Sequence, residues 1–433
     1  MGSAWRTRLG VVTTAVVLAT TLASCGDSTS ASGTPTLNWY INPDNGGQQT
    51  IAQRCSDDSA GAYTIKTAIL PSDAAQQREQ LMRRLAGNDS SIDLMSLDPV
   101  FVPETAEAGF LAEIPADVQK TLSDGVVGGA VQGASWKGQL VTAPFWANTQ
   151  LLWYRKSVAQ AAGLDMTRPV TWEQLIEAAR TQGTAIGVQG QRAESMTVWV
   201  NAMIASAGGK IIENPDAKGQ DIRLGLDTDA GRAAATVMKD ITTAGVGGPG
   251  IDNRDEAATA NLFQQGGAAF MVNWPFVYAQ GKSAADEGTM DRSIFDDYGW
   301  TTYPAMAEGK AAAPPLGGID VGVGNFSNHK DAAFQAVQCI VSEQNQAAYM
   351  VSDGNPAALE SVYDDPAVQA AYPMYDTIRT SLQAAAPRPQ TAYYNEVSQG
   401  IADRWQPVAG VDDSTPAGSQ DYIQQVLRGE KLL

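Results

Sequence analysis

Strand-like and helix-like segments alternate in the first part of the chain, and this order limits the possible folds more than any other feature of the sequence. Short apolar runs predict strands at 36–41, 63–70 and 92–97, and apolar spacing between them predicts helices at 46–57 and 72–85. Ser72 or Asp73 is suited to cap the second helix. Because strands joined through helices usually form a parallel sheet, we expect an α/β fold with mostly parallel sheets flanked by helices. Ligands of such sheets bind beyond the carboxyl ends of the strands, and Asp98 follows the third strand.

The length of the chain predicts two domains, because 433 residues with 44% hydrophobic content supply two cores. The extended segment 140–156, LVTAPFWANTQLLWYRK, is interrupted by a proline and an Asn-Thr pair, and we interpret it as a crossing between the domains. Thr171 and Gln174 form a capping box at the start of the helix that follows. Further helices are expected at 171–181, 196–207, 228–244, 255–265, 330–343, 366–382 with a break at Pro373, 393–403 and 419–428, and further strands at 268–273, 298–303 and 316–324.

The N-terminal region predicts secretion and lipidation. Arg6 and Arg8 precede a largely apolar run, 9–23, which is short for a membrane span but fits a secretory signal. The run ends in LASC, which resembles the lipobox of bacterial lipoproteins, so we expect a diacylated Cys25 as the first mature residue. An ordinary signal peptide with an incidental cysteine is the alternative. The Ser/Thr/Gly-rich residues that follow predict a flexible tether.

Charge and composition argue against several classes of protein. The 29 basic and 47 acidic side chains give a formal net charge of -18, and such a surface repels phosphate backbones, so we expect no nucleic-acid partner. Three cysteines and one histidine argue against zinc and iron–sulfur sites, and we expect neither a metal nor a cofactor. The histidine, His329, lies in a helix-entry loop, where a surface or capping role is expected.

Aromatic and polar side chains stand at breaks in the secondary-structure pattern. Trp274 precedes Pro275, and because proline disfavours helix in the residue before it, Trp274 should be extended at a strand end and face a loop or cleft. Pyranose rings stack their C–H faces on indole and pair their hydroxyls with carboxylates, amides and guanidinium groups. The set predicts a carbohydrate site, although each residue alone fits a structural role; its members are Asp98, Trp146, Asn148, Trp274, Gly318 and Arg388.

The order of the motifs resembles the maltose/trehalose-binding lipoproteins of bacterial ABC importers, most closely the actinobacterial trehalose-binding type. The motifs are LMSLDP, APFWANTQLLWYRK, FQQGGAAFMVNWP, LGGIDVGVG and PRPQTAYY, in order from about residue 36 to the C-terminus. The resemblance implies a two-lobed α/β protein of the type II periplasmic-binding fold, with the ligand cleft between the lobes. The implied parts are the signal peptide 1–24, the tether 25–35, lobe I from 36–143 and 303–355, and lobe II from 144–302 and 356–433.

The resemblance also implies roles for single residues. Asp98 would bind sugar hydroxyls and Trp274 would stack on the sugar, so the indole that ends its strand would face the cleft. The other implied ligand-binding residues are Asn42, Asn45, Gln48, Trp146, Asn148, Glu256, Gly318, Ile319 and Arg388. Relatives often carry a carboxylate at Asn148 and some a second tryptophan at Ile319, and these departures favour a compact disaccharide, trehalose. Cys55 and Cys339, assigned to lobe I, would form a disulfide or remain two buried thiols.

We therefore expect a monomeric binding protein without enzymatic activity that closes around trehalose or an analogue. It would deliver the sugar to membrane permease subunits while its lipid holds it at the outer face of the cell membrane. Two alternatives stay open. One is an extracellular glycoside hydrolase that uses Asp98 and Glu256 as paired carboxylates. The other is a cell-wall interaction lipoprotein without a small ligand.

Overall fold

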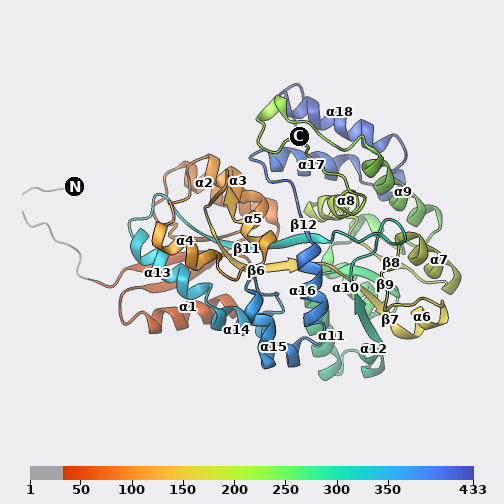
Figure 1. The fold of residues 1–433 in the computed structure, drawn as a ribbon, viewed down its shortest axis with the longest axis horizontal. Coiled ribbons are helices and arrows are strands. Elements are labelled where there is room, and N and C mark those ends of the chain that lie inside the picture. The colour runs from red at the N-terminus through yellow and green to blue at the C-terminus, as the bar shows by residue number, and fades with distance from the viewer. Residues whose placement is uncertain (1–32) are drawn as a thin grey trace, which may run out of the picture. The chain divides into compact units, whose positions relative to one another are not determined.

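A computed structural model describes residues 33–433, of which Pro35–Leu433 form one unit (Figure 1). The predicted signal peptide, Cys25 and most of the tether lie outside the described residues. In the described part of the chain, no helix is both long and apolar enough to cross a membrane.

The first sheet has six strands, in the order β12-β11-β3-β1-β2, with β6 also paired to β11. Its strands are β1 Thr36–Ile41, β2 Thr64–Ile69, β3 Leu94–Leu97, β6 Ala143–Thr149, β11 Pro315–Val323 and β12 Ala386–Pro387. The strands β1, β2 and β3 pair in parallel, which confirms the prediction made from strand and helix alternation. Because β11 enters from a later crossing of the chain, it runs antiparallel to β3 and β6, and the sheet is mixed.

The second sheet has the order β10-β7-β9-β8. Its strands are β7 Leu151–Arg155, β8 Ile186–Gly187, β9 Phe270–Asn273 and β10 Tyr298–Thr301. Only Gln150 separates β6 of the first sheet from β7 of the second. The segment 140–156, predicted to cross between domains, therefore passes from the first sheet to the second (Figure 1). A separate hairpin is formed by β4 Ser135–Trp136 and β5 Gln139–Leu140.

Helices surround both sheets, and most of the long ones begin near their predicted positions. They are α1 Gly47–Asp58, α2 Ala74–Ala86, α3 Val102–Glu107, α4 Ala116–Ser123, α5 Gly128–Gly133, α6 Lys156–Ala161, α7 Trp172–Gln182, α8 Glu194–Ser206, α9 Asp229–Thr243, α10 Glu256–Gln264, α11 Phe276–Asp286, α12 Arg292–Asp296, α13 Lys330–Ile340, α14 Glu343–Asp353, α15 Pro366–Ala371, α16 Tyr375–Ala384, α17 Tyr394–Arg404 and α18 Thr415–Leu427. The capping box of Thr171 and Gln174 is present, and Asp73 caps α2. The last helix begins at Thr415, before the predicted 419, because Pro416 is accommodated in its first turn.

The three largest clusters of buried side chains form most of the core. One lies against the first sheet with α1 and α13 and includes Trp39 and Phe145, and another lies among α7, α8, α9 and α17 and includes Trp172 and Trp199. The third cluster contains Leu316 of the first sheet together with side chains of the second sheet. Because this shared cluster joins the two sheets, the core alone does not assign every segment to one lobe, and the lobe boundaries stay a prediction.

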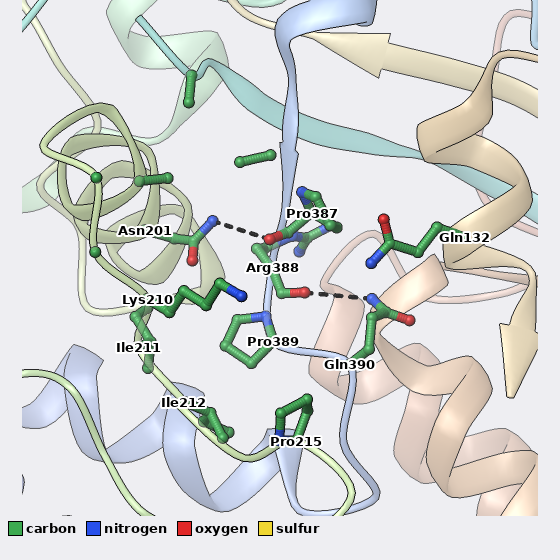
Figure 2. Close-up of a pocket in the computed structure, with 15 residues that line it drawn as sticks. Gln132, Asn201, Lys210, Ile211, Ile212, Pro215, Pro387, Arg388, Pro389 and Gln390 are labelled. Atoms are coloured by element: carbon green, nitrogen blue, oxygen red, sulfur yellow. Dashed lines mark hydrogen bonds between the residues drawn. The ribbon is translucent and has the colours of Figure 1, made fainter. Parts of the chain in front are cut away.

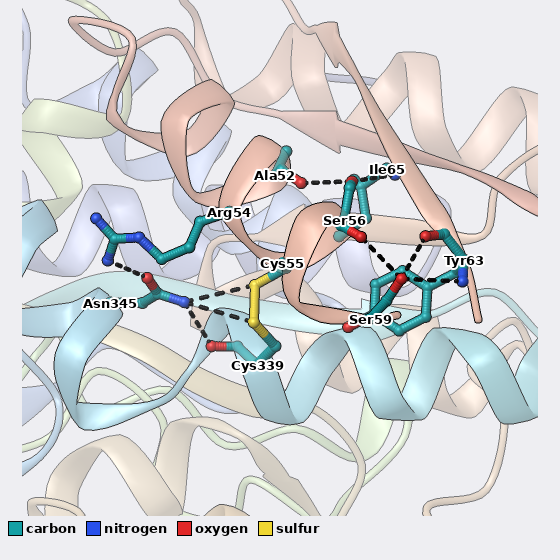
Figure 3. Close-up of a disulfide and its surroundings, with 9 residues drawn as sticks. All are labelled: Ala52, Arg54, Cys55, Ser56, Ser59, Tyr63, Ile65, Cys339 and Asn345. Atoms are coloured by element: carbon teal, nitrogen blue, oxygen red, sulfur yellow. Dashed lines mark hydrogen bonds between the residues drawn. A yellow bond between two sulfur atoms is a disulfide. The ribbon is translucent and has the colours of Figure 1, made fainter. Parts of the chain in front are cut away.

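Cys55 on α1 and Cys339 on α13 form a disulfide (Figure 3). The side-chain amide of Asn345 donates to the Cys339 carbonyl oxygen at 2.8 Å, and its oxygen accepts from Arg54 at 2.7 Å. The bond joins residues that are 284 positions apart in sequence. It thus ties the helix after β1 to the helix after β11.

Candidate functional site

A cavity of about 680 Å³ opens where elements of both sheets meet. Asp98 follows β3 of the first sheet, and Trp274 follows β9 of the second. Glu194 and Glu256 are the first residues of α8 and α10, where the positive end of the helix dipole favours a carboxylate. The cavity therefore presents acidic, amide and indole groups from both sheets.

Nine of the predicted ligand-binding residues line this cavity. They are Asn42, Asp98, Trp146, Asn148, Glu256, Trp274, Gly318, Ile319 and Arg388. The structure thus gathers residues that are spread over most of the sequence around one space. Their roles toward a ligand stay predictions.

Asn45 and Gln48 are not among the residues that line the cavity, and their part in ligand binding stays a prediction. The Gln48 side chain is fully buried, where its amide donates to the Asn42 carbonyl oxygen at 2.9 Å and its oxygen accepts from the Ser96 hydroxyl at 3.2 Å. The backbone N–H of Asn45 donates to Asp353 at 2.8 Å. Both residues hold the loop in shape, and this loop brings Asn42 and Pro43 to the cavity.

Trp274 occupies the position that its sequence context predicts, directly after the last residue of β9 and before the proline that precedes α11. Its backbone N–H donates to the side-chain oxygen of Asn273 at 2.9 Å, which fixes the strand end. A Cβ atom at Gly317 would lie 3.1 Å from the Trp274 ring. A residue without a side chain at 317 therefore leaves room for the indole against β11.

The close approach of β6 requires a glycine at position 318. Its φ of +135° is a conformation that other residues rarely adopt, and an added Cβ would lie 2.2 Å from the Trp146 carbonyl oxygen. The pairing of β11 with β6 sets Ile319 opposite Trp146, and both line the cavity. Backbone packing of β6 against β11 thus explains the glycine at this position of the LGGIDVGVG strand.

An ionic network centred on Arg388 forms one wall of the cavity. The Arg388 guanidinium donates to Asp98 at 2.8 Å and to Glu194 at 2.6 Å, and its side chain is only 3% exposed. Glu194 also accepts hydrogen bonds from the hydroxyls of Tyr394 and Ser398. Burial alone would lower the pKa of Arg388, but the two carboxylates raise it well above its usual value. Arg388 therefore stays charged and links Asp98, after the first sheet's β3, to α8.

Burial has the opposite effect on the two glutamates. It raises the pKa of Glu194 above its usual value, and the charge of Arg388 offsets only part of this rise. Burial also raises the pKa of Glu256, whose carboxyl oxygens lie 2.9 and 3.0 Å from the Ser195 hydroxyl. No basic side chain is paired with Glu256 in residues 33–433. Its carboxyl group can therefore accept from, or when protonated donate to, a ligand hydroxyl.

Sequence reasoning missed Glu194, Gln191, Gln77 and Asn355, which also line the cavity. Glu194 begins a long helix, where an acidic residue is common for reasons of the helix dipole alone. Nothing in its local sequence distinguishes it from such a residue. Among the described residues, no cluster of three or more His, Cys, Asp or Glu side chains could hold a metal ion.

Residues 61–347, more than half of the chain, match the family model of bacterial extracellular solute-binding proteins. A probable ABC transporter-binding protein of Deinococcus radiodurans is 24% identical over 357 residues, which cover 78% of this chain and 80% of the relative.

Two solved structures extend the comparison to the fold. Maltose-bound MalE3 of T. maritima superposes with a TM-score of 0.77 at 22% identity, covering 92% of this chain and all of the other (100%). A tagatose-bound ABC transporter solute-binding protein of Thermotoga lettingae gives a TM-score of 0.74 at 19% identity, with coverages of 91% and 100%. At these identities the likeness shows the fold, the two-lobed type II binding-protein fold. The chain belongs to the family of bacterial extracellular solute-binding proteins.

Proposed function

We propose that this protein captures a disaccharide outside the cell and delivers it to an ABC importer, and that the disaccharide is trehalose. The observation that carries the proposal is the composition of the 680 Å³ cavity. Two indoles, Trp146 and Trp274, share it with the carboxylates of Asp98 and Glu256. Flat apolar faces beside charged and amide acceptors are what sugar rings and their hydroxyls require.

The placement of these groups supports capture by closure. Asp98 comes from the first sheet, whereas Trp274 and Glu256 come from the segment that forms and flanks the second. A sugar that contacts both sets would favour the closed arrangement of the lobes, and a permease would recognise that arrangement. Such delivery breaks no bond in the sugar. The named relatives support this direction, since they are described as an ABC transporter-binding protein and as maltose- and tagatose-bound proteins.

The choice of trehalose rests on the motif resemblance and on two side chains of the cavity. Asn148 on β6 is uncharged and Ile319 on β11 is aliphatic, and both are largely buried. A second indole at 319 would offer a further stacking surface for a longer chain of glucose units. Its absence, together with the amide at Asn148, fits a short ligand. The lipid anchor at Cys25 and the position at the outer face of the membrane rest on the sequence alone.

Calorimetric titration of the protein with trehalose, maltose and mannitol tests the proposal. We expect trehalose to bind more tightly than maltose, and mannitol to bind least. Tighter binding of maltose would refute the trehalose assignment, and binding of none of the sugars would refute sugar capture. Incubation with each disaccharide, followed by a glucose assay, separates capture from hydrolysis; released glucose would contradict the proposal and favour the hydrolase.

Trp274→Ala tests whether the sugar binds in this cavity, and Trp136→Ala is the control. Trp136 lies outside the cavity, in the β4–β5 hairpin, where its indole N–H donates to Glu107. We expect the first substitution to weaken sugar binding and the second to leave it unchanged. Equal affinities in both variants would place the sugar elsewhere.

A further inference from the structure

A second cavity, of about 380 Å³, lies beside the segment 386–390 (Figure 2). Only Arg388 lines both this cavity and the candidate sugar cavity. Asn201 and Ala205 of α8 line the second cavity, whereas Glu194 and Val198, nearer the start of the same helix, line the sugar cavity. Its volume falls within the range of about 300–1,000 Å³ that small-molecule sites occupy.

The charge of the second cavity is the reverse of that in the sugar cavity. No aspartate or glutamate lines it, although the chain as a whole has a formal net charge of -18. Lys210 does line it, and this lysine makes no ion pair within residues 33–433. The other basic residue, Arg388, is already paired with two carboxylates of the sugar cavity. Lys210 is therefore the group that can attract an anion here.

The remaining walls are mostly apolar and are held in place. Ile211 and Ile212 are 1% and 4% exposed and belong to the core cluster around α8 and α9, so their backbone is fixed by packing. Pro387 and Pro389 also line the cavity, and their rings restrict the backbone. The Asn201 side chain donates to the Pro387 carbonyl oxygen at 3.4 Å and anchors this segment to α8.

The few polar groups converge on the apolar space. In Figure 2, the Lys210 amine and the Gln132 amide extend toward segment 387–390 from opposite sides. Gln132 belongs to α5, whereas Lys210 follows α8. An amide can donate to an anionic oxygen at the same time as the ammonium group does. No indole and no carboxylate lines this cavity, so it lacks the groups that suit a pyranose ring.

We infer that this cavity is a second binding site, which takes a small monocarboxylate with an apolar body. Lys210 pairs with the carboxylate, Gln132 donates to one of its oxygens, and Ile211, Pro387 and Pro389 cover the apolar part. A charge-assisted hydrogen bond at the rim fixes the orientation, and burial of the apolar body supplies the affinity. This site is independent of the sugar assigned to the other cavity.

The probe 4-phenylbutyrate has this chemistry, and its binding to the full protein can be measured by calorimetry. We expect one molecule of phenylbutyrate to bind per chain. The neutral 4-phenylbutanamide should bind at least about fivefold more weakly, because it lacks the charge that Lys210 attracts. Lys210→Gln should weaken phenylbutyrate by about the same factor and leave the amide unchanged. Lys210→Glu should reverse the preference, so that 4-phenylbutylamine binds better than phenylbutyrate.

Two controls keep the outcomes distinct. Lys66→Gln removes an exposed lysine from the edge strand β2, which lines neither cavity, and it should leave phenylbutyrate binding unchanged. Trp274→Ala alters the sugar cavity and should also leave it unchanged. Absence of binding up to the solubility limit, equal binding by Lys210→Gln, or loss of binding in Trp274→Ala would each overturn the inference. The result with Trp274→Ala also separates this site from the proposed sugar site.

Discussion

Replacement of Arg388 by alanine removes the cation that holds two carboxylates together. The Arg388 side chain is 3% exposed, and those of Asp98 and Glu194 are 19% and 20% exposed. Removal of one partner from a fully buried ion pair costs about 3–5 kcal/mol, because the remaining charge is left without compensation. Since both carboxylates keep some contact with solvent, we expect the free energy of unfolding to fall by about 2–3 kcal/mol.

The loss should depend on pH in a defined direction. Burial already raises the pKa of Glu194 in the folded protein, and without Arg388 the attraction that offsets this rise is lost. A carboxyl group whose folded-state pKa is raised binds its proton more tightly in the folded state, so its contribution to stability is present at low pH and lost as pH rises through that pKa. The variant should therefore recover part of its lost stability between neutral pH and about pH 5.

Urea unfolding of the wild type and of Arg388→Ala at neutral and mildly acidic pH measures this effect. The buried Asp320 also has a pKa raised by burial and by the charge of Asp98, so its response to the loss of Arg388 is part of the difference between the two proteins. Arg292→Ala is a suitable control, because Arg292 is half exposed in its ion pair with Asp286 and should contribute at most about 1 kcal/mol. A deficit in Arg388→Ala that is no larger than in the control, or that grows as the pH falls, would refute the reasoning.

Three further predictions concern the sugar, the central strand and the disulfide. Trp274→Ala should weaken trehalose binding by about 2 kcal/mol, which is roughly thirtyfold in affinity measured by calorimetry. The variant loses about 1.5 kcal/mol of apolar burial and a further contribution from ring stacking. An unchanged affinity would contradict this. Gly318→Ala should lower the melting temperature clearly, because its Cβ would meet a carbonyl oxygen at 2.2 Å, whereas Gly418→Ala, with nothing within 4 Å, should be neutral or slightly stabilising. Replacing both Cys55 and Cys339 with serine should reduce the free energy of unfolding by about 2–4 kcal/mol in urea titrations, and a loss below that of a surface substitution would contradict the expectation.

Local sequence was sufficient where one stretch of chain decides its own structure. The apolar runs at β1, β2 and β3 and the helices between them were predicted nearly to the residue, because burial on one face imposes a period on the side chains. The capping box at Thr171 was equally local, since both of its partners lie within one turn. Trp274 was placed at a strand end for the same reason, because Pro275 restricts the residue before it.

Short helices escaped prediction for a related reason. Segments such as α3 and α5 have six residues each, too few to show a helical period, and α5 is rich in glycine. Their helical state depends on packing against β4 and β6 rather than on their own propensity. The sequence predicted β11 as a strand and β7 only as part of the extended crossing segment, and the antiparallel direction of both depends on which distant segment they join.

The cavities depend on contacts between residues that are far apart in sequence, and only the tertiary structure decides these contacts. Arg388 meets Asp98 and Glu194 across separations of 290 and 194 residues, and no local pattern marks Glu194 as their partner. The side chain of Gln48, a predicted ligand-binding residue, makes buried hydrogen bonds that only the folded chain supplies. Sequence periodicity determines which faces are buried, because apolar surface left exposed to water costs free energy in each segment by itself. Which polar groups remain available to a ligand is determined only when the partners of every buried donor and acceptor are fixed by the fold.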